Sequence, residues 1–232
     1  MTMTPLHRHQ IAWLSESGWQ AVQQHDRDAT ARDCLAHWAA RRLPLVVTRQ
    51  DRLTGDDTIA LGLPAPGRWA RRRLAISVPR CDVLYFDEFP LADDLLCVLP
   101  ASARPAWRTL CAGLRAVNAH ARVYGSHGWQ LLSGLDHVRA GSDIDLWLSV
   151  SDEAQADAAT ACLQSASDAT PGALPRLDGE LMFNDGAAVA WREWLAWRAG
   201  RVKSLLVKTL VGSTVVRSRT WHGTAPWAEA AA

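Results

Sequence analysis

Two aspartates one residue apart, Asp143 and Asp145, are the strongest chemical signal in the sequence. They flank Ile144 in an apolar run that favours a strand, and a strand sends alternate side chains to the same face. At a separation of about 4–5 Å, two carboxylates repel by roughly 3–4 kcal/mol at an effective dielectric near 20. This repulsion raises at least one pKa unless a cation lies between them. We therefore expect a divalent ion such as Mg²⁺, which prefers carboxylate and phosphate oxygens.

Gly125 and Ser126 form the expected phosphate-binding side of the site. They follow an apolar run that ends at Tyr124, and apolar residues at helical spacing come next. Glycine permits a tight exit from a strand, and Ser126 is a suitable N-cap for the helix. The free N–H groups of a helix start bind phosphate. A solvated strand face beside an ordinary turn is the alternative, but the apolar residues on both sides of the acids disfavour it.

The order of these pieces resembles the signature of the DNA polymerase β-type nucleotidyltransferase superfamily. Gly125-Ser126, a helix and Asp143-Ile144-Asp145 occur in the same succession. The sequence departs from the pattern in one respect, because residues 127–142 make a longer interval than is usual there. We assign the extra loop to residues 137–142.

The resemblance implies a third carboxylate on a following strand. Asp178 and Glu180 are placed to supply it, and period-2 alternation puts both on one face of residues 177–183. The sequence does not choose between them, and an exposed turn is the alternative for this segment. In the superfamily the third acid helps to hold the metal or accepts the proton of the nucleophile.

The elements that carry these residues follow from hydrophobic spacing and turn signals. We expect helices over residues 28–41, 105–117, 151–165 (with Ser151 as cap) and 190–197. We expect strands over residues 44–48, 74–78, 145–150 and 177–183, a strand ending at residue 124, and a hairpin of residues 204–210 and 213–216. Residues 61–67 and 167–176 have turn-forming compositions and are predicted to be loops.

These elements predict an α+β protein with two domains. A small N-terminal α/β domain would occupy residues 1–90. A nucleotidyltransferase-like domain, with a mixed sheet flanked by helices, would occupy residues 91–221, and residues 222–232 would form a tail.

Composition limits the classes of partner. The chain has 232 residues, of which 48% are hydrophobic, and a formal net charge of +1. This balance argues against general binding to nucleic acid or to a membrane surface. Five cysteines without a C-x-x-C pair indicate reduced thiols, and neither a signal peptide nor a membrane span is recognisable. We therefore expect a cytoplasmic protein.

Three features have two interpretations each. Residues 71–73 are consecutive arginines, which form either a solvated edge or a patch that contacts a phosphorylated ligand or an acidic partner protein. Lys208 either faces the site and neutralises a leaving pyrophosphate or faces solvent. The three tryptophans of residues 191–197 either pack in the core or form a wall for a base or a pantetheine arm.

Seven stretches together resemble a narrower family, the malonate decarboxylase holo-acyl-carrier-protein synthases, also called phosphoribosyl-dephospho-CoA transferases. They are Arg8-His9 with Trp13-Leu14, and residues 44–47, 61–64, 124–126, 142–146, 177–180 and 188–193. The order of a small N-terminal domain before a nucleotidyltransferase-like domain is also similar.

This resemblance implies a reaction. The donor would be 2′-(5″-triphosphoribosyl)-3′-dephospho-CoA, and the acceptor a serine of the acyl carrier protein subunit of malonate decarboxylase, with release of pyrophosphate. Asp143 and Asp145 would hold Mg²⁺, Gly125 and Ser126 would bind phosphates, and Asp178 or Glu180 would complete the site. Two alternatives remain: a nucleotidyltransferase that uses an ordinary nucleoside triphosphate, and a non-catalytic binding protein on a decayed transferase fold.

Overall fold

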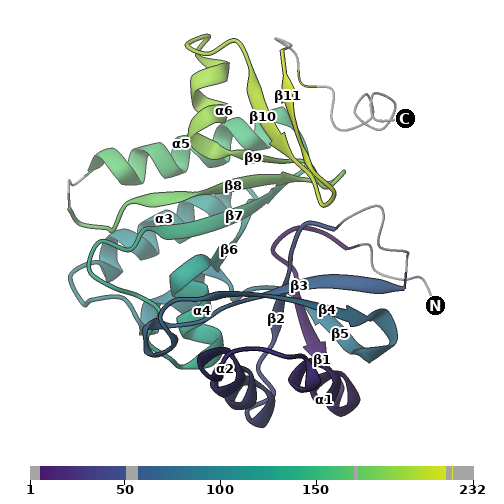
Figure 1. The fold of residues 1–232 in the computed structure, drawn as a ribbon. Helices are drawn as coiled ribbons and strands as arrows, with labels where there is room; N and C mark the ends of the chain where they lie inside the picture. The colour runs from purple at the N-terminus through teal and green to yellow at the C-terminus, as the bar shows by residue number, and fades with distance from the viewer. Residues whose placement is uncertain (1–5, 51–56, 170–171, 218–220, 222–232) are drawn as a thin grey trace. The chain divides into compact units, whose positions relative to one another are not determined.

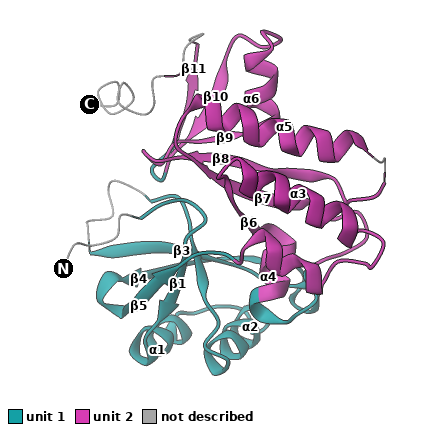
Figure 2. Cartoon of the chain, turned by 180° about the vertical axis from the view of Figure 1, so that it is seen from behind, with its two compact units in different colours: residues 1–89, 132–137, 210–212 teal, residues 90–131, 138–209, 213–232 magenta. Residues whose placement is uncertain are grey.

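The computed structural model describes residues 6–50, 57–169, 172–217 and 221. The chain forms two compact units, shown in Figure 2. Residues 1–89, 132–137 and 210–212 make the first, and residues 90–131, 138–209 and 213–232 make the second. The predicted tail at residues 222–232 lies outside the described residues.

The first unit is a five-stranded antiparallel sheet with two helices. Its strand order is β4-β3-β2-β1-β5. The strands are β1 (Ile11–Leu14), β2 (Leu45–Val47), β3 (Thr58–Pro64), β4 (Arg73–Pro79) and β5 (Val83–Asp87), and the helices are α1 (Glu16–Gln24) and α2 (Ala29–Ala40). The side chain of Asp28 accepts a hydrogen bond from the backbone N–H of Ala31, which fixes the start of α2 where the sequence predicts it.

The prediction of a loop over residues 61–67 is wrong for residues 61–64, because residues 58–64 form β3 and pair with the whole of β4. Gly62 and Pro64 suggest a turn, but Ile59, Leu61 and Leu63 alternate and are all buried. A Cβ at Gly62 would lie 2.8 Å from the Cγ2 of Thr48. The glycine therefore allows a close approach within the sheet and does not end the strand.

The second unit is a six-stranded mixed sheet in the order β11-β10-β9-β8-β7-β6, in which only β7 and β8 are parallel. Its strands are β6 (His120–Tyr124), β7 (Ile144–Val150), β8 (Leu177–Phe183), β9 (Ala188–Ala190), β10 (Leu205–Lys208) and β11 (Ser213–Val216). Its helices are α3 (Arg104–Ala116), α4 (Gly125–Ser133), α5 (Glu153–Ala169) and α6 (Trp191–Arg198). The prediction of an α+β protein is confirmed.

The two faces of this sheet have different surroundings. Ile144, Leu146 and Leu148 of β7 belong to the core that α3, α5 and α6 cover (Figure 1). Since successive side chains of a strand alternate, Asp145 and Trp147 lie on the opposite face. There Trp147 packs with Met182, Ala188 and Tyr124. The fold thus buries the apolar residues of β7 under helices and turns its acid to the other side.

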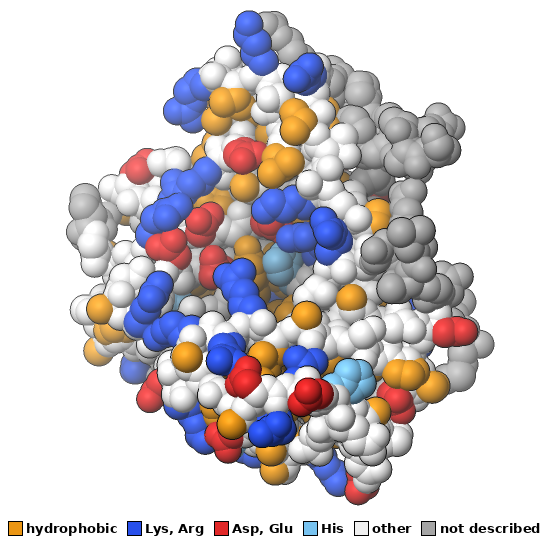
Figure 3. Space-filling view, viewed as in Figure 1, with side chains coloured by type: hydrophobic (Ala, Val, Ile, Leu, Met, Phe, Trp, Pro, Cys, Tyr) orange, Lys and Arg blue, Asp and Glu red, His pale blue; other side chains and the backbone are white. Residues whose placement is uncertain are grey.

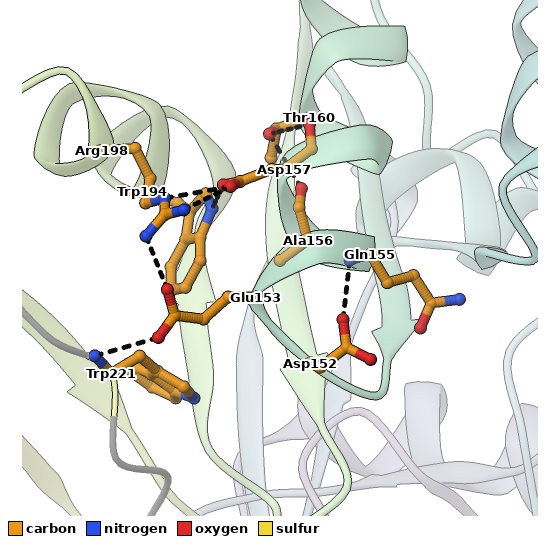
Figure 4. Close-up of polar contacts among 9 residues, drawn as sticks. All are labelled: Asp152, Glu153, Gln155, Ala156, Asp157, Thr160, Trp194, Arg198 and Trp221. Carbon is orange, nitrogen blue, oxygen red and sulfur yellow. Dashed lines mark hydrogen bonds and ion pairs between the residues drawn. The ribbon is translucent and has the colours of Figure 1, made fainter.

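The tryptophans of α6 pack in the core, as the first of their two interpretations has it, and they do not form a ligand-binding wall. Trp191, Trp194 and Trp197 are each at most 6% exposed. The indole N–H of Trp194 donates to Asp157 of α5 at 2.8 Å (Figure 4). Arg198 pairs with the same aspartate at 2.6 Å. These contacts fasten α6 to α5.

The start of α5 also differs from the prediction. The side chain of Asp152, rather than Ser151, caps the helix by accepting from the N–H of Gln155 at 2.9 Å (Figure 4). The helix continues to residue 169, so the predicted loop starts later than residue 167. Within the described residues, no helix has the length and apolar character needed to cross a membrane.

Candidate active site

The parallel register of β7 and β8 brings the predicted acids together. Asp145 is the register partner of Asp178. Asp143 immediately precedes β7, and its Oδ2 lies 3.0 Å from Nη1 of Arg176. The Nη2 of the same arginine lies 3.0 Å from Oδ2 of Asp178. We call Asp143, Asp145 and Asp178 the acidic cluster; it forms where two strands far apart in sequence run side by side.

Asp145 is the least compensated member of the acidic cluster. Its burial, and then the negative charges of Asp178 and Asp143, raise the pKa of its carboxyl to about 6. Within the described part of the chain, no side chain or backbone N–H donates a hydrogen bond to this carboxylate. Carboxylate oxygens that repel one another in this way have the chemistry of a site for a hard divalent cation.

The residues therefore suit Mg²⁺ in donor chemistry. Among the described residues, no three His, Cys, Asp or Glu side chains have the geometry of a metal centre. The guanidinium of Arg176 spans Asp143 and Asp178 instead. A cation bound at Asp143 and Asp145 would replace part of the charge that Arg176 now supplies.

Gly125 is required for the approach of Asp145 to the start of α4. It has a φ of +61°, and a Cβ there would lie only 1.9 Å from Oδ2 of Asp145. The helix begins at Gly125, so Ser126 lies in its first turn. The prediction of Ser126 as the N-cap is therefore wrong. The free N–H groups of that turn therefore lie beside the acidic cluster, where the positive end of the helix favours phosphate as well as carboxylate.

His127 joins the same turn to the acids, and the sequence analysis missed it. It is 4% exposed, and burial lowers the pKa of its imidazole, so the ring is neutral at pH 7. Its Nδ1 lies 3.0 Å from the carbonyl oxygen of Asp143, which can only accept, so Nδ1–H is the donor. The bond fixes the start of β7 against α4. The only sequence signal was its position directly after the Gly-Ser pair.

The structure separates the two acids that the sequence analysis ranked equally. Glu180 pairs in register with Trp147, not with Asp145. It is 4% exposed, and its Oε1 lies 2.6 Å from Nζ of Lys208 on β10. Asp178 is the acid beside Asp145, whereas Glu180 forms an ion pair further along β8.

Gly179 explains why β8 can lie so close to β7. It has a φ of +129°, and a Cβ there would lie 1.7 Å from the carbonyl oxygen of Leu146. Only glycine fits at this point. The sequence Asp178-Gly179-Glu180 thus places one acid in the cluster and allows the backbone contact that aligns it.

Arg176 was also missed by the sequence analysis. Its backbone carbonyl accepts from the N–H of Ile144 at 2.9 Å, so its Cα is fixed beside the acidic cluster. Its side chain is 59% exposed. An isolated arginine in a loop carries no sequence signal, and its role becomes visible only when β7 and β8 are paired.

The three arginines of residues 71–73 lie in the first unit, and two of them make contacts within the protein. The Nη1 of Arg71 donates to the carbonyl of His137 at 3.3 Å, and Arg72 forms an ion pair with Asp28. Arg73 is exposed at the start of β4. On the face seen in Figure 3, basic and acidic side chains are interspersed, in agreement with a net charge of +1.

Two family models match the chain over nearly its whole length. The model described as phosphoribosyl-dephospho-CoA transferase MdcG N-terminal domain matches residues 7–89, and the corresponding C-terminal domain matches residues 90–219. No solved structure matches the chain significantly.

Curated relatives give the same name. Phosphoribosyl-dephospho-CoA transferase from Xanthomonas axonopodis pv. citri is 36% identical, covering 87% of this chain and 90% of the relative. The enzyme of that name from Bradyrhizobium diazoefficiens is 34% identical, covering 89% and 88%. The one from Pseudomonas syringae pv. tomato is 33% identical, covering 82% and 86%.

Proposed function

This chain belongs to the phosphoribosyl-dephospho-CoA transferase family, and from this premise we propose its donor, its acceptor and the roles of its residues. The donor is 2′-(5″-triphosphoribosyl)-3′-dephospho-CoA, and the acceptor is a serine of the acyl carrier protein subunit of malonate decarboxylase. The observation that carries the proposal is the acidic cluster at the start of β7 and β8, beside the first turn of α4.

The reaction requires the site to orient the phosphates, to accept a proton from the serine, to position the reactants and to neutralise charge. The serine oxygen attacks the α-phosphorus of the donor, a P–O bond to that phosphorus forms, and the bond to the pyrophosphate breaks with its electron pair. The first turn of α4, at Gly125 and Ser126, orients the phosphates through backbone N–H groups. Asp178 accepts the serine proton as the third acid. Catalysis otherwise depends on positioning and on neutralising charge.

Asp143 and Asp145 are the residues that would hold Mg²⁺. The support for this role is the raised pKa of the Asp145 carboxyl and the absence of a hydrogen bond to it within the described residues. The ion, when bound, supplies positive charge to the phosphates of the donor. His127 keeps Asp143 in place by donating to its carbonyl.

Glu180 and Lys208 have a supporting role in this proposal. Lys208 neutralises the buried carboxylate of Glu180 at 2.6 Å. That ion pair holds β10 to β8 on the face that carries the acidic cluster. We therefore assign the third acid to Asp178 and not to Glu180.

Mass spectrometry of the carrier protein tests this function. The apo carrier subunit is incubated with the enzyme, Mg²⁺ and the triphosphoribosyl donor, and in parallel with ATP. We expect the carrier to gain the mass of the phosphoribosyl-dephospho-CoA group on one serine, with one pyrophosphate released. Nucleotidyl addition from ATP without reaction of the CoA derivative would instead favour an ordinary nucleotidyltransferase, and no modification with either donor would favour a binding protein.

Asp178→Asn and Glu180→Gln separate the two candidate acids in the same assay. Asp178→Asn removes the proton acceptor, so we expect the transfer rate to fall by about 10²-fold or more. Glu180→Gln keeps the shape of a residue outside the acidic cluster and should retain most of the rate. The reverse order would reassign the third acid to Glu180.

A further inference from the structure

We propose that Arg176, whose guanidinium contacts Asp143 and Asp178, binds the departing pyrophosphate when a metal ion is held by Asp143 and Asp145. This inference rests on the proposed function for the identity of the leaving group. It names a phosphate-binding residue that neither the sequence motifs nor the family descriptions indicate.

The first support is the way in which Arg176 is held. Its two terminal nitrogens each contact one acid at 3.0 Å, Asp143 on one side and Asp178 on the other. These acids come from neighbouring strands, so one guanidinium screens both. The backbone is fixed by the bond from Ile144 N–H to the Arg176 carbonyl. Only the side chain is therefore free to move.

The second support is that the two ion pairs of Arg176 are weak. The Arg176 side chain is 59% exposed, and the side chains of Asp143 and Asp178 are 33% and 36% exposed. Ion pairs at such exposure contribute little to stability, because water and salt screen them. A divalent cation that binds Asp143 would therefore displace the guanidinium at small cost.

The third support is the balance of charge. Three carboxylates against one guanidinium leave the acidic cluster two negative charges in excess. A divalent cation lowers the summed charge of the three acids from −3 to −1, so its binding weakens their attraction for the guanidinium of Arg176. The bond that breaks in transfer leaves new negative charge on pyrophosphate, and an arginine fork matches phosphate oxygens better than a point charge does.

The fourth support is a small cavity that Arg176 lines together with a second arginine, although Asp143, Asp145 and Asp178 are not among its lining residues. It has a volume of about 180 Å³ and is lined by both Arg176 and Arg192, together with Ser167 and Pro175. Arg192 is anchored by donating from Nη2 to the carbonyl of Leu177 at 3.0 Å. Its guanidinium carbon lies 4.2 Å from the ring centroid of Trp191. Two guanidinium groups thus border one cavity, and one of them is fixed.

Two binding measurements on Arg176→Ala test the inference without donor or carrier. Manganese binding, followed by electron paramagnetic resonance of Mn²⁺, should tighten by about fivefold or more, because a competing cation is removed. Binding of inorganic pyrophosphate with Mg²⁺, followed by calorimetry, should weaken by about tenfold or more, because charge-assisted hydrogen bonds are lost. The opposite signs in one variant distinguish the proposal from a purely structural role.

Two further variants sharpen the test. Arg192→Ala should weaken pyrophosphate binding without tightening Mn²⁺ binding, because Arg192 does not contact the acids. Arg115→Ala is the matched control, since Arg115 forms an exposed ion pair with Asp93 at 2.5 Å in the same unit. It should change neither affinity.

The inference is overturned if Arg176→Ala leaves pyrophosphate affinity unchanged, if it weakens Mn²⁺ binding, or if Arg115→Ala reproduces its effects. Failure of the proposed function is a separate result. A carrier that gains no mass, together with the expected shifts in both affinities, would reject the acceptor and leave Arg176 as a phosphate-binding residue. A modified carrier with unchanged affinities would reject only the role of Arg176.

Discussion

Asp145→Asn should make the metal-free protein more stable while it abolishes transfer. Burial and the negative charges of Asp178, Asp143 and Glu180 raise the pKa of the Asp145 carboxyl from 3.8 to about 6. A shift of about two units corresponds to about 3 kcal/mol between the two protonation states. Asparagine has the same shape and no charge, so the variant escapes this cost.

The sign of the pH dependence follows from linkage. The folded state holds the Asp145 proton more tightly than the unfolded state, so wild-type stability falls as the pH rises from about 4 to above 6. The variant lacks this loss. The difference between the two proteins should therefore be small near pH 4, grow through pH 5 and 6, and stay constant above pH 7.

Thermal unfolding in EDTA measures this difference. For a chain of this size about 1 kcal/mol shifts Tm by roughly 2–4 °C, so the variant should melt about 6–12 °C above wild type at pH 8. Mg²⁺ should raise the Tm of wild type and have little effect on the variant.

Asp152→Asn is the control with the opposite sign. The hydrogen bond from Gln155 N–H lowers the pKa of the Asp152 carboxyl, so any stability that this charge provides is lost as the pH falls. This variant should not gain stability at pH 8. The reasoning is refuted if Asp145→Asn is less stable than wild type at pH 8, or if the difference between them does not change with pH.

Two other perturbations have expected outcomes. Gly125→Ala should lose about 1–3 kcal/mol of stability and most transfer activity, because its φ is +61° and the new Cβ would meet Oδ2 of Asp145; denaturant unfolding and the carrier assay measure the two effects. Lys208→Met should destabilise the protein by about 3–5 kcal/mol, because it removes the cation that neutralises the buried Glu180 carboxylate. Adding Glu180→Gln should restore most of that loss in a double-mutant cycle, and a double variant as unstable as Lys208→Met would show that the ion pair is not the cause.

Local patterns were sufficient to predict much of the second unit. The apolar alternation around Asp143 and Asp145 predicted β7, and the spacing of apolar residues predicted α3 and α6. These predictions succeed because a strand or an amphipathic helix shows its buried face in its own sequence.

The errors arose where distant residues decide the structure. Gly62 and Pro64 carry turn signals, yet β4 pairs with that whole segment. The alternation of side chains along a strand places Asp178 and Glu180 on the same face and does not distinguish them. Only the register of β8 with β7 puts Asp178 beside Asp145. Arg176 has no motif of its own, and its partners are 33 and two residues away. Pairing between strands supplies information that a local pattern does not contain.

A crystal of the enzyme grown with Mn²⁺ and pyrophosphate, measured at the manganese absorption edge, tests the central claim most directly. We predict one anomalous peak within about 2.0–2.4 Å of oxygens of both Asp143 and Asp145, in the range of carboxylate ligands of hard cations. A structure in which those carboxylates bind no manganese, or in which the metal lies at Glu180, would contradict the account.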